Sequence, residues 1–140
     1  MTSRASNGPI DWPTLEARAI AARDNAHAPY SSYRVGAALI TASGAVFAGC
    51  NVENASYGLT LCAERSAIAQ MVSAGARGPI AIVVATRGPR AGTPRGMCRQ
   101  VLAEFALDLP VRLIAIDPTG ETIDTTLEAL LPNAFRADSL

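Results

Sequence analysis

The sequence predicts an α/β protein, a three-layer α/β/α sandwich on a mixed five-stranded sheet. Two observations carry this prediction. Helical segments alternate with strands after an initial hairpin, and residues 79–85 form a continuous apolar run, typical of a strand that helices cover on both faces. The 140 residues have the length of one domain. We therefore expect residues 1–140 to form a single domain, with roughly residues 1–10 as a flexible N-terminal tail.

The first half of the chain predicts one helix and one hairpin. Asp11 can cap the helix, and Pro13 fits its first turn because that position needs no backbone N–H. The Ser43-Gly44 pair favours a tight turn between two strands. In order, the expected elements are a helix over residues 12–26, a break at 29–32, a strand over 33–41, a turn at 43–44 and a strand over 45–50.

The second half predicts helices and strands in alternation. Gly75 ends a helix that starts at Thr60 or Leu61, because glycine is the usual residue just past a helix end. Three glycines and two prolines within residues 87–96 indicate a loop. In order, the expected elements are a helix to residue 74, a buried strand over 79–85, the loop over 87–96, a helix over 97–105, a buried strand over 111–116, a turn at 118–120, a strand over 121–124 and a helix over 126–131.

The composition excludes several kinds of chemistry. All 12 basic residues are arginines, so lysine Schiff-base catalysis and the lysine-dependent phosphate loop are excluded. The single histidine, His27, excludes metal sites that need two imidazoles. Metal or nucleophilic chemistry is therefore left to 12 carboxylates, one imidazole and three cysteines, Cys50, Cys62 and Cys98.

Charge and hydropathy predict the kinds of partner. The formal net charge of zero argues against nucleic acid, whose binding proteins usually carry a basic patch. No apolar run approaches the roughly 18 residues that span a bilayer, so we expect no membrane partner. An odd, low cysteine count without a secretory signal indicates reduced thiols and a soluble, cytoplasmic protein.

The chain is 49% hydrophobic and only 17% charged, against about 25% charged in an average soluble domain. An alanine-rich helical scaffold explains these values, because alanine supplies much of the apolar fraction. Apolar surface that other subunits cover explains them equally well. Composition alone leaves both explanations open.

Cys62 and Cys98 are expected in the first turns of two helices, one before and one after the apolar strand over residues 79–85. Helix N-termini carry a partial positive charge, which biases both sulfurs toward thiolate. Helices beside one parallel crossover bring their N-termini to the same edge of the sheet, where α/β proteins place ligands. Both cysteines are therefore candidate zinc ligands, and packing as small buried side chains is the alternative.

Two short motifs surround this pair. Cys62-Ala63-Glu64 places a carboxylate two residues after the first sulfur, and Pro94-Arg95-Gly96-Met97-Cys98 follows later in the chain. Zinc deaminases combine a ligand-x-Glu triplet with P-C-x-x-C, and their glutamate transfers protons without binding the metal. The second motif keeps its proline, its spacing and its last cysteine, but Arg95 stands where the first cysteine is usual.

Further segments match in order and spacing: 29–31, 35–38, 49–58, 98–102, 130–132 and Phe135. With these segments and the two motifs, residues 12–135 resemble the small, homotetrameric type of cytidine deaminase, within the cytidine/deoxycytidylate deaminase superfamily. The resemblance implies a cytidine deaminase-like fold, one Zn²⁺ per subunit and a homotetramer. It also implies zinc-dependent hydrolysis of cytidine and 2′-deoxycytidine to uridine and 2′-deoxyuridine plus ammonia, in pyrimidine salvage.

The resemblance also assigns residue roles. Glu64 is implied as the catalytic proton carrier, and Cys62 and Cys98 as two of the three zinc ligands. The implied substrate-binding residues are Asn51, Glu53, Ala63, Tyr57 and Phe135. Of these, Asn51 and Glu53 match the pair that holds the ribose hydroxyls, and alternate residues of extended chain do share a face. A polar strand end is the alternative explanation for that pair.

Other residues near these motifs have less specific roles. Tyr30 and Tyr33 match positions that line or brace the pocket. Arg65 and Arg99 each follow a ligand cysteine and can hydrogen-bond to its sulfur, or they can simply face solvent. Cys50 is expected on the strand face opposite Asn51 and Glu53, away from the pocket.

Arg95 keeps three functions open. Arginine does not deprotonate in proteins, so Arg95 cannot bind zinc. The first function is a cytidine deaminase that tolerates or compensates for this arginine. The second is a catalytically impaired nucleoside-binding relative, and the third is a deaminase of another cytosine nucleoside, such as blasticidin S. All three have a small-molecule nucleoside as the partner.

Overall fold

The computed structural model describes residues 10–118 and 120–140. Residues 1–9 of the expected N-terminal tail lie outside the described residues, and so does Thr119 of the turn expected at 118–120. Within the described ranges, no helix combines the length and the apolar character that crossing a membrane requires.

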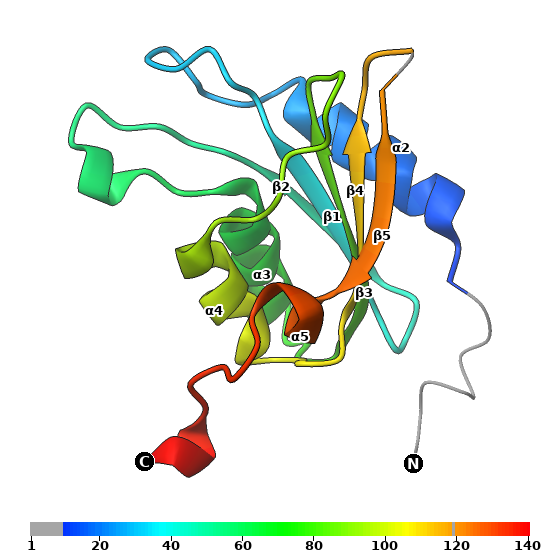
Figure 1. Ribbon diagram of the computed structural model, residues 1–140, viewed down its shortest axis with the longest axis vertical. Helices are drawn as coiled ribbons and strands as arrows, with labels where there is room; N and C mark the ends of the chain where they lie inside the picture. The colour runs from blue at the N-terminus through cyan, green and yellow to red at the C-terminus, as the bar shows by residue number, and fades with distance from the viewer. Residues whose placement is uncertain (1–9, 119) are drawn as a thin grey trace.

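A mixed five-stranded sheet forms the middle layer of the molecule (Figure 1). Its strands are β1 (Gly36–Thr41), β2 (Val46–Cys50), β3 (Pro79–Thr86), β4 (Pro110–Ala115) and β5 (Thr122–Thr126). Their order in space is β2-β1-β3-β4-β5, with β3 and β4 parallel and the other neighbouring pairs antiparallel. The predicted mixed sheet, with its initial hairpin, is confirmed.

Helices form the two outer layers. They are α2 (Trp12–Arg23), α3 (Ala63–Ser73), α4 (Gly96–Ala103) and α5 (Leu127–Leu130), with 3-10 turns at Tyr57–Leu59 and Ala137–Ser139. In Figure 1, α2 lies on one side of the sheet, and α3, α4 and α5 lie on the other side. The chain is therefore the three-layer α/β/α sandwich that the sequence predicts.

The central strand β3 shows how the two layers of helices share one sheet. All of its residues are buried. Ile82 and Val84 belong to the hydrophobic cluster of α3, α4 and α5, whereas Ala81 and Val83 belong to the cluster that contains Leu15 of α2. Because side chains alternate across a strand, one continuous apolar run supplies both clusters.

A glycine brings α3 close to the edge strand β2. A Cβ atom at Gly49 would lie only 2.5 Å from the Cβ atom of Ser66, so a larger side chain would push the helix away. At this approach, Ser66 Oγ donates to the carbonyl of Cys50, and Gln70 Nε2 donates to the carbonyl of Ala48, both at 2.9 Å. These contacts fix α3 against the sheet and position its N-terminus.

The helix before β3 begins later than the sequence predicts. It starts at Ala63, and Cys62 is its N-cap in extended backbone. The reason is a pair of backbone hydrogen bonds between Val52 and Leu61, at 2.8 and 2.9 Å, which keeps the preceding chain extended. Cys62 therefore precedes the first turn of α3, while Cys98 lies in the first turn of α4 as expected.

Candidate functional site

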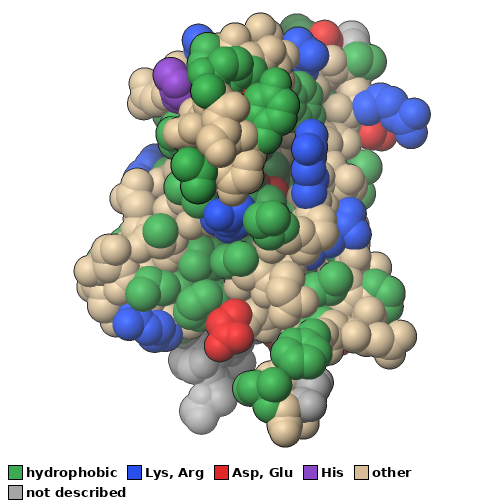
Figure 2. Space-filling model, turned by 90° about the vertical axis from the view of Figure 1, so that its left-hand side faces the viewer, with side chains coloured by type: hydrophobic (Ala, Val, Ile, Leu, Met, Phe, Trp, Pro, Cys, Tyr) green, Lys and Arg blue, Asp and Glu red, His purple; other side chains and the backbone are tan. Residues whose placement is uncertain are grey.

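A cavity of about 600 Å³ opens at the N-termini of α3 and α4. Its lining includes residues from the segments 30–35, 51–65 and 92–98, together with Val84 and Thr86 of β3. The cavity lies past the carboxyl end of β3, beside the crossover to β4, where α/β sheets bind ligands. Figure 2 shows this side of the molecule, on which hydrophobic and arginine side chains gather around a hollow.

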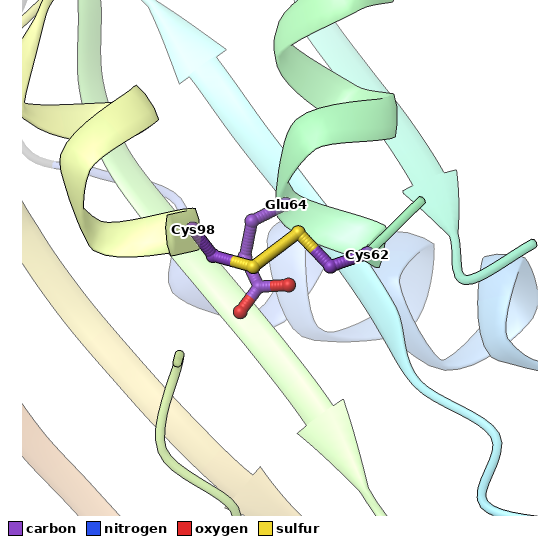
Figure 3. A group of neighbouring side chains, drawn as sticks. All are labelled: Cys62, Glu64 and Cys98. Carbon is purple, nitrogen blue, oxygen red and sulfur yellow. A yellow bond between two sulfur atoms is a disulfide. The ribbon is translucent and has the colours of Figure 1, made fainter. Parts of the chain in front are cut away.

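Cys62 and Cys98 meet in this cavity (Figure 3). Their Cα atoms are 6.9 Å apart, and their sulfur atoms are bonded as a disulfide. The predicted convergence of the two cysteines is confirmed, but the predicted reduced thiols are not what the structure has. The reason is geometric, because two neighbouring helix N-termini direct both side chains to the same point. Zinc binding requires the reduced form of this pair, since the thiolate is the metal ligand.

Glu64 is the third member of this group. It is the second residue of α3 and is only 4% exposed. A carboxylate oxygen of Glu64 and the sulfur atoms of Cys62 and Cys98 all lie within 4.8 Å of one another (Figure 3). Burial raises the pKa of Glu64 above its ordinary value, because a carboxylate loses its hydration there. The backbone N–H of Glu64 and the guanidinium of Arg95 lower that pKa by less.

Arg95 lies beside this group and remains exposed. It is the N-cap residue of α4, in extended backbone, and its side chain lines the cavity. Within residues 10–118 and 120–140, its guanidinium makes no hydrogen bond and no ion pair, although its charge acts on Glu64 at longer range. A fixed cation therefore occupies the wall where the deaminase motif has a thiolate.

Asn51 and Glu53 both line the cavity, as the alternation of extended chain predicts. Asn51 Oδ1 accepts from the backbone N–H of Val35 at 2.9 Å, and its Nδ2 donates to the carbonyl of Tyr33 at 2.8 Å. The side chain of Asn51 therefore fixes the segment before β1. It also explains why that strand begins at Gly36, three residues later than predicted.

The side chain of Glu53 fixes residues 30–31 in a similar way. Its Oε1 accepts from the backbone N–H groups of Tyr30 and Ser31, at 2.9 and 3.1 Å, and its Oε2 accepts from the hydroxyl of Ser31. The Ser31 hydroxyl is the main cause of a lowered pKa at Glu53, and the two backbone N–H groups add to it. Ser31 is a site residue whose contact the sequence does not predict, because 22 residues separate it from Glu53.

The aromatic residues predicted for the pocket divide into two groups. Tyr30, Tyr33 and Tyr57 line the cavity, and the rings of Tyr30 and Tyr57 meet edge to face with centroids 6.3 Å apart. Phe135 lies outside the lining of this cavity and is 59% exposed, with its carbonyl accepting from Gln100 Nε2 at 2.9 Å. The structure thus brings three of the four aromatics to the site.

The two arginines that follow the cysteines do not bond to the cysteine sulfurs. Arg65 Nη1 donates instead to Met97 Sδ at 3.0 Å, across the gap between α3 and α4. Arg99 donates to the carbonyls of Pro94 and Leu130, at 2.6 and 2.5 Å. Both arginines therefore link neighbouring segments of the site, which corrects their expected roles as sulfur partners or as solvent-facing residues.

The remaining candidate residues fall on either side of the cavity boundary. Ala63 is fully buried in the cavity wall at the start of α3. Cys50 and His27 lie outside the lining, and neither belongs to the described group of metal-ligand side chains. The prediction that Cys50 faces away from the pocket is confirmed.

A glutamate buried beside two cysteines, at paired helix N-termini on a mixed sheet, is the arrangement of the zinc-dependent deaminases. Residues 13–111 match the family model of the cytidine and deoxycytidylate deaminase zinc-binding region. The chain belongs to this family.

Individual relatives agree with the family over nearly the full length. The chain is 44% identical to a cytidine deaminase of Halalkalibacterium halodurans, over 94% of this chain and 98% of that protein. It is 39% identical to a cytidine deaminase of Mycobacterium tuberculosis, over 94% of each. The crystal structure of cytidine deaminase from Burkholderia pseudomallei superposes with a TM-score of 0.85 at 45% identity, covering 90% of this chain and 100% of that one.

The matched family model describes a zinc-binding region, and the side chains at this site include donor atoms that bind zinc. Cys62, Glu64 and Cys98 bring two sulfurs and one carboxylate oxygen together, and all three are zinc donors in proteins. Three protein ligands are also the usual number in a catalytic zinc site. The donor atoms present therefore fit zinc, although Arg95 removes the third sulfur of the deaminase motif.

Proposed function

We propose that this protein hydrolyses cytidine and 2′-deoxycytidine to uridine and 2′-deoxyuridine plus ammonia. The observation that carries the proposal is the buried carboxylate of Glu64, within 4.8 Å of two sulfurs in a cavity of about 600 Å³. Relatives at 39–44% identity that are named cytidine deaminases support it. The reaction belongs to pyrimidine salvage in the cytoplasm, with an uncharged nucleoside as substrate and neither nucleic acid nor a membrane as a partner.

In this proposal the reduced side chains of Cys62 and Cys98 hold the zinc. When bound there, zinc supplies a water molecule that loses a proton near neutral pH. Both sulfurs leave helix N-termini, whose partial positive charge favours the thiolate that a metal needs.

Glu64 moves the protons. Its carboxylate takes the proton from the attacking water, transfers it to N3 of the cytosine ring, and later assists the departure of the amino group. A carbon–oxygen bond forms at C4, the carbon–nitrogen bond at C4 breaks, and ammonia carries away the amino nitrogen. Burial suits this role, because it raises the pKa of Glu64 toward the pH at which the proton must be exchanged.

Asn51 and Glu53 hold the sugar, because each side chain still has hydrogen-bonding positions that its contacts within the protein do not use. A carboxylate offers about four lone-pair positions, of which three groups at Tyr30 and Ser31 use three. Asn51 likewise retains one N–H and one lone pair beyond its bonds to the segment before β1. Each side chain can therefore bind a ribose hydroxyl without releasing its clamp on the protein.

The base is held by residues nearer the metal. The backbone of Ala63 faces the ring, and Tyr57 lies at the rim of the cavity. Phe135 contributes to the pocket of a neighbouring subunit in a homotetramer, which is consistent with its 59% exposure away from the cavity of its own chain. Tyr57, Leu59 and Met97 are also 66–77% exposed, and subunit contacts would cover such apolar surface.

The direct test is metal analysis and cytidine turnover of the purified, reduced chain. We expect bound zinc, ammonia release from cytidine, and a mass in solution of four subunits. The Arg95→Cys variant is expected to bring zinc toward one per subunit and to increase turnover. Stoichiometric zinc in the parent chain, with no change in Arg95→Cys, would show that Arg95 does not impair the site.

A nucleoside-binding protein without turnover is the second candidate function, because Arg95 replaces a ligand of the motif. Saturable cytidine binding in the absence of zinc and of ammonia release would favour that function. Turnover of the parent chain would exclude it. Turnover of a different cytosine nucleoside, with cytidine inert, would change the substrate and leave the reaction type unchanged.

A further inference from the structure

The carboxylate of Glu64 is buried without a cationic partner of its own. It is 4% exposed, and no arginine lies within ion-pair distance of it among the residues that the structure describes. A buried carboxylate is costly unless it keeps its proton or a cation or hydrogen-bond donors compensate for its lost hydration, and here only its own backbone N–H and the distant charge of Arg95 compensate. The two sulfurs within 4.8 Å of it are themselves anionic when reduced, so the group as a whole favours a bound cation.

We infer that Glu64 is the third protein ligand of the metal in this chain, completing a site of two cysteine sulfurs and one carboxylate oxygen. The inference rests on the proposed function only in that it needs a metal at this site. It differs from the deaminase pattern, in which the glutamate stays outside the coordination shell.

The distances allow this role. Around a tetrahedral zinc ion, ligand atoms lie roughly 3.6 to 3.8 Å apart, given bonds of about 2.3 Å to sulfur and 2.0–2.2 Å to oxygen. The three donor atoms here lie within 4.8 Å of one another, so small side-chain rotations bring them onto one ion once the cysteines are reduced. Glu64 and Cys62 also leave the same end of α3, only two residues apart.

The charge agrees with the geometry. Three thiolates around Zn²⁺ give a net charge of −1, and two thiolates plus one carboxylate give the same value. Glu64 thus replaces both the charge and the donor atom that Arg95 removes from the motif. The guanidinium of Arg95, which is exposed and unpaired among the described residues, then faces this anionic group and balances it.

This coordination has a consequence for the proton chemistry. An oxygen bound to a metal has one lone pair committed, so a ligated carboxylate is a weaker proton acceptor than a free one. Turnover must then use the second oxygen of Glu64 or await its release from the metal. A third thiolate at position 95 frees Glu64, which is why Arg95→Cys should accelerate the reaction as well as tighten zinc binding.

The inference is tested by zinc affinity, measured by competition with a chelating dye in the presence of a phosphine reductant. Four chains are compared: the parent, Glu64→Gln, Arg95→Cys and the double variant. Glu64→Gln should weaken zinc binding at least about tenfold in the parent, because losing a direct ligand costs no less than losing a residue that only supports one. The same change should alter affinity less than about twofold in the Arg95→Cys background, where the third ligand is a thiolate.

Glu53→Gln is the matched control, since Glu53 is a carboxylate of the same cavity that lies outside the donor group. It should leave zinc affinity unchanged. X-ray absorption at the zinc edge adds a direct count, with two sulfurs expected in the parent and three in Arg95→Cys. Circular dichroism confirms that each variant is folded before its affinity is compared.

The outcomes separate this inference from the proposed function. Unchanged zinc affinity in Glu64→Gln, or no zinc binding by the parent, overturns Glu64 as a ligand. A parent that binds zinc through Glu64 and yet releases no ammonia supports the ligand role and refutes the deaminase activity. A parent that deaminates cytidine, and whose zinc affinity does not depend on Glu64, supports the deaminase activity and refutes the ligand role.

Discussion

Two arginines on opposite sides of the sheet show how differently this chain uses the same side chain. Arg112 of β4 packs on the α2 side, where it pairs with Glu16 at 2.8 Å and Asp124 at 2.7 Å and lies 4.3 Å from the ring centroid of Trp12. Arg95 lines the cavity on the α3 and α4 side and has no such partner among the described residues.

The charge of Arg112 has a structural role, whereas the charge of Arg95 lies in the candidate functional site. The partners of Arg112 come from α2 and β5, so its charge holds these two elements against β4. The buried carboxylate of Glu64, which Arg95 faces only at longer range, is left available to a ligand. Substitutions in the two regions should therefore affect different properties, stability in one and activity in the other.

The largest effect is expected from Glu64→Gln. It removes the proton carrier while preserving size, so kcat for cytidine should fall by about 10²–10⁴-fold, the usual contribution of a general acid and base. The melting temperature should not fall, in contrast to a change at Arg112. Turnover within tenfold of the parent would contradict the assigned role.

The same variant has a pH-dependent effect on stability. Because the pKa of Glu64 is raised in the folded state, the folded protein retains a proton that the unfolded chain loses as pH rises through the ordinary value near 4.5. The free energy of unfolding of the parent should therefore fall, relative to Glu64→Gln, as pH rises from 4 toward neutrality. Denaturant titrations of both metal-free, oxidised chains measure this difference, and a constant difference across the range would refute the raised pKa.

The next effect is expected from Arg112→Met. It removes two ion pairs and a cation–π contact, and should lower the free energy of unfolding by about 1–3 kcal/mol. Turnover of cytidine at 25 °C should be unchanged, because the cluster lies across the sheet from the cavity. Arg90→Met, at an exposed loop position, is the control and should shift stability by less than about 0.5 kcal/mol. Lost activity with intact stability would erase the distinction between the two regions.

The smallest effect is expected from Ser31→Ala. It removes one of the three hydrogen bonds that the Glu53 carboxylate accepts from Tyr30 and Ser31. If Glu53 holds the sugar, KM should rise about 2- to 10-fold with little change in kcat, and steady-state kinetics measures both. Ser73→Ala, at the exposed end of α3, is the matched control. An unchanged KM would restrict Glu53 to fixing its own loop.

The sequence predicted the fold well because its signals are local. The apolar run of β3, the turn at Gly44 and the alternation of elements each depend on a few neighbouring residues. The convergence of Cys62, Glu64 and Cys98 was also predictable, since it follows from two helices beside one crossover.

What the sequence did not predict depends on contacts between distant segments. The bridge from Val52 to Leu61 delays the start of α3, and the clamp of Glu53 on Ser31 joins residues 22 positions apart. The pairing of Arg65 with Met97 likewise depends on how two helices are oriented. Periodicity carries no information about such contacts.

The hydrogen bonds of Arg99 connect the start of α4, next to the candidate metal site, to the C-terminal segment. One guanidinium spans the carbonyl of Pro94, next to Arg95, and the carbonyl of Leu130 at the end of α5. The next residue, Gln100, donates a hydrogen bond from Nε2 to the carbonyl of Phe135. Arg99 and Gln100 directly follow Cys98, so both contacts with the C-terminal segment fall on the part of α4 that carries this sulfur. Truncating the chain before Leu130 would remove both contacts, and we expect it to weaken zinc binding at Cys98.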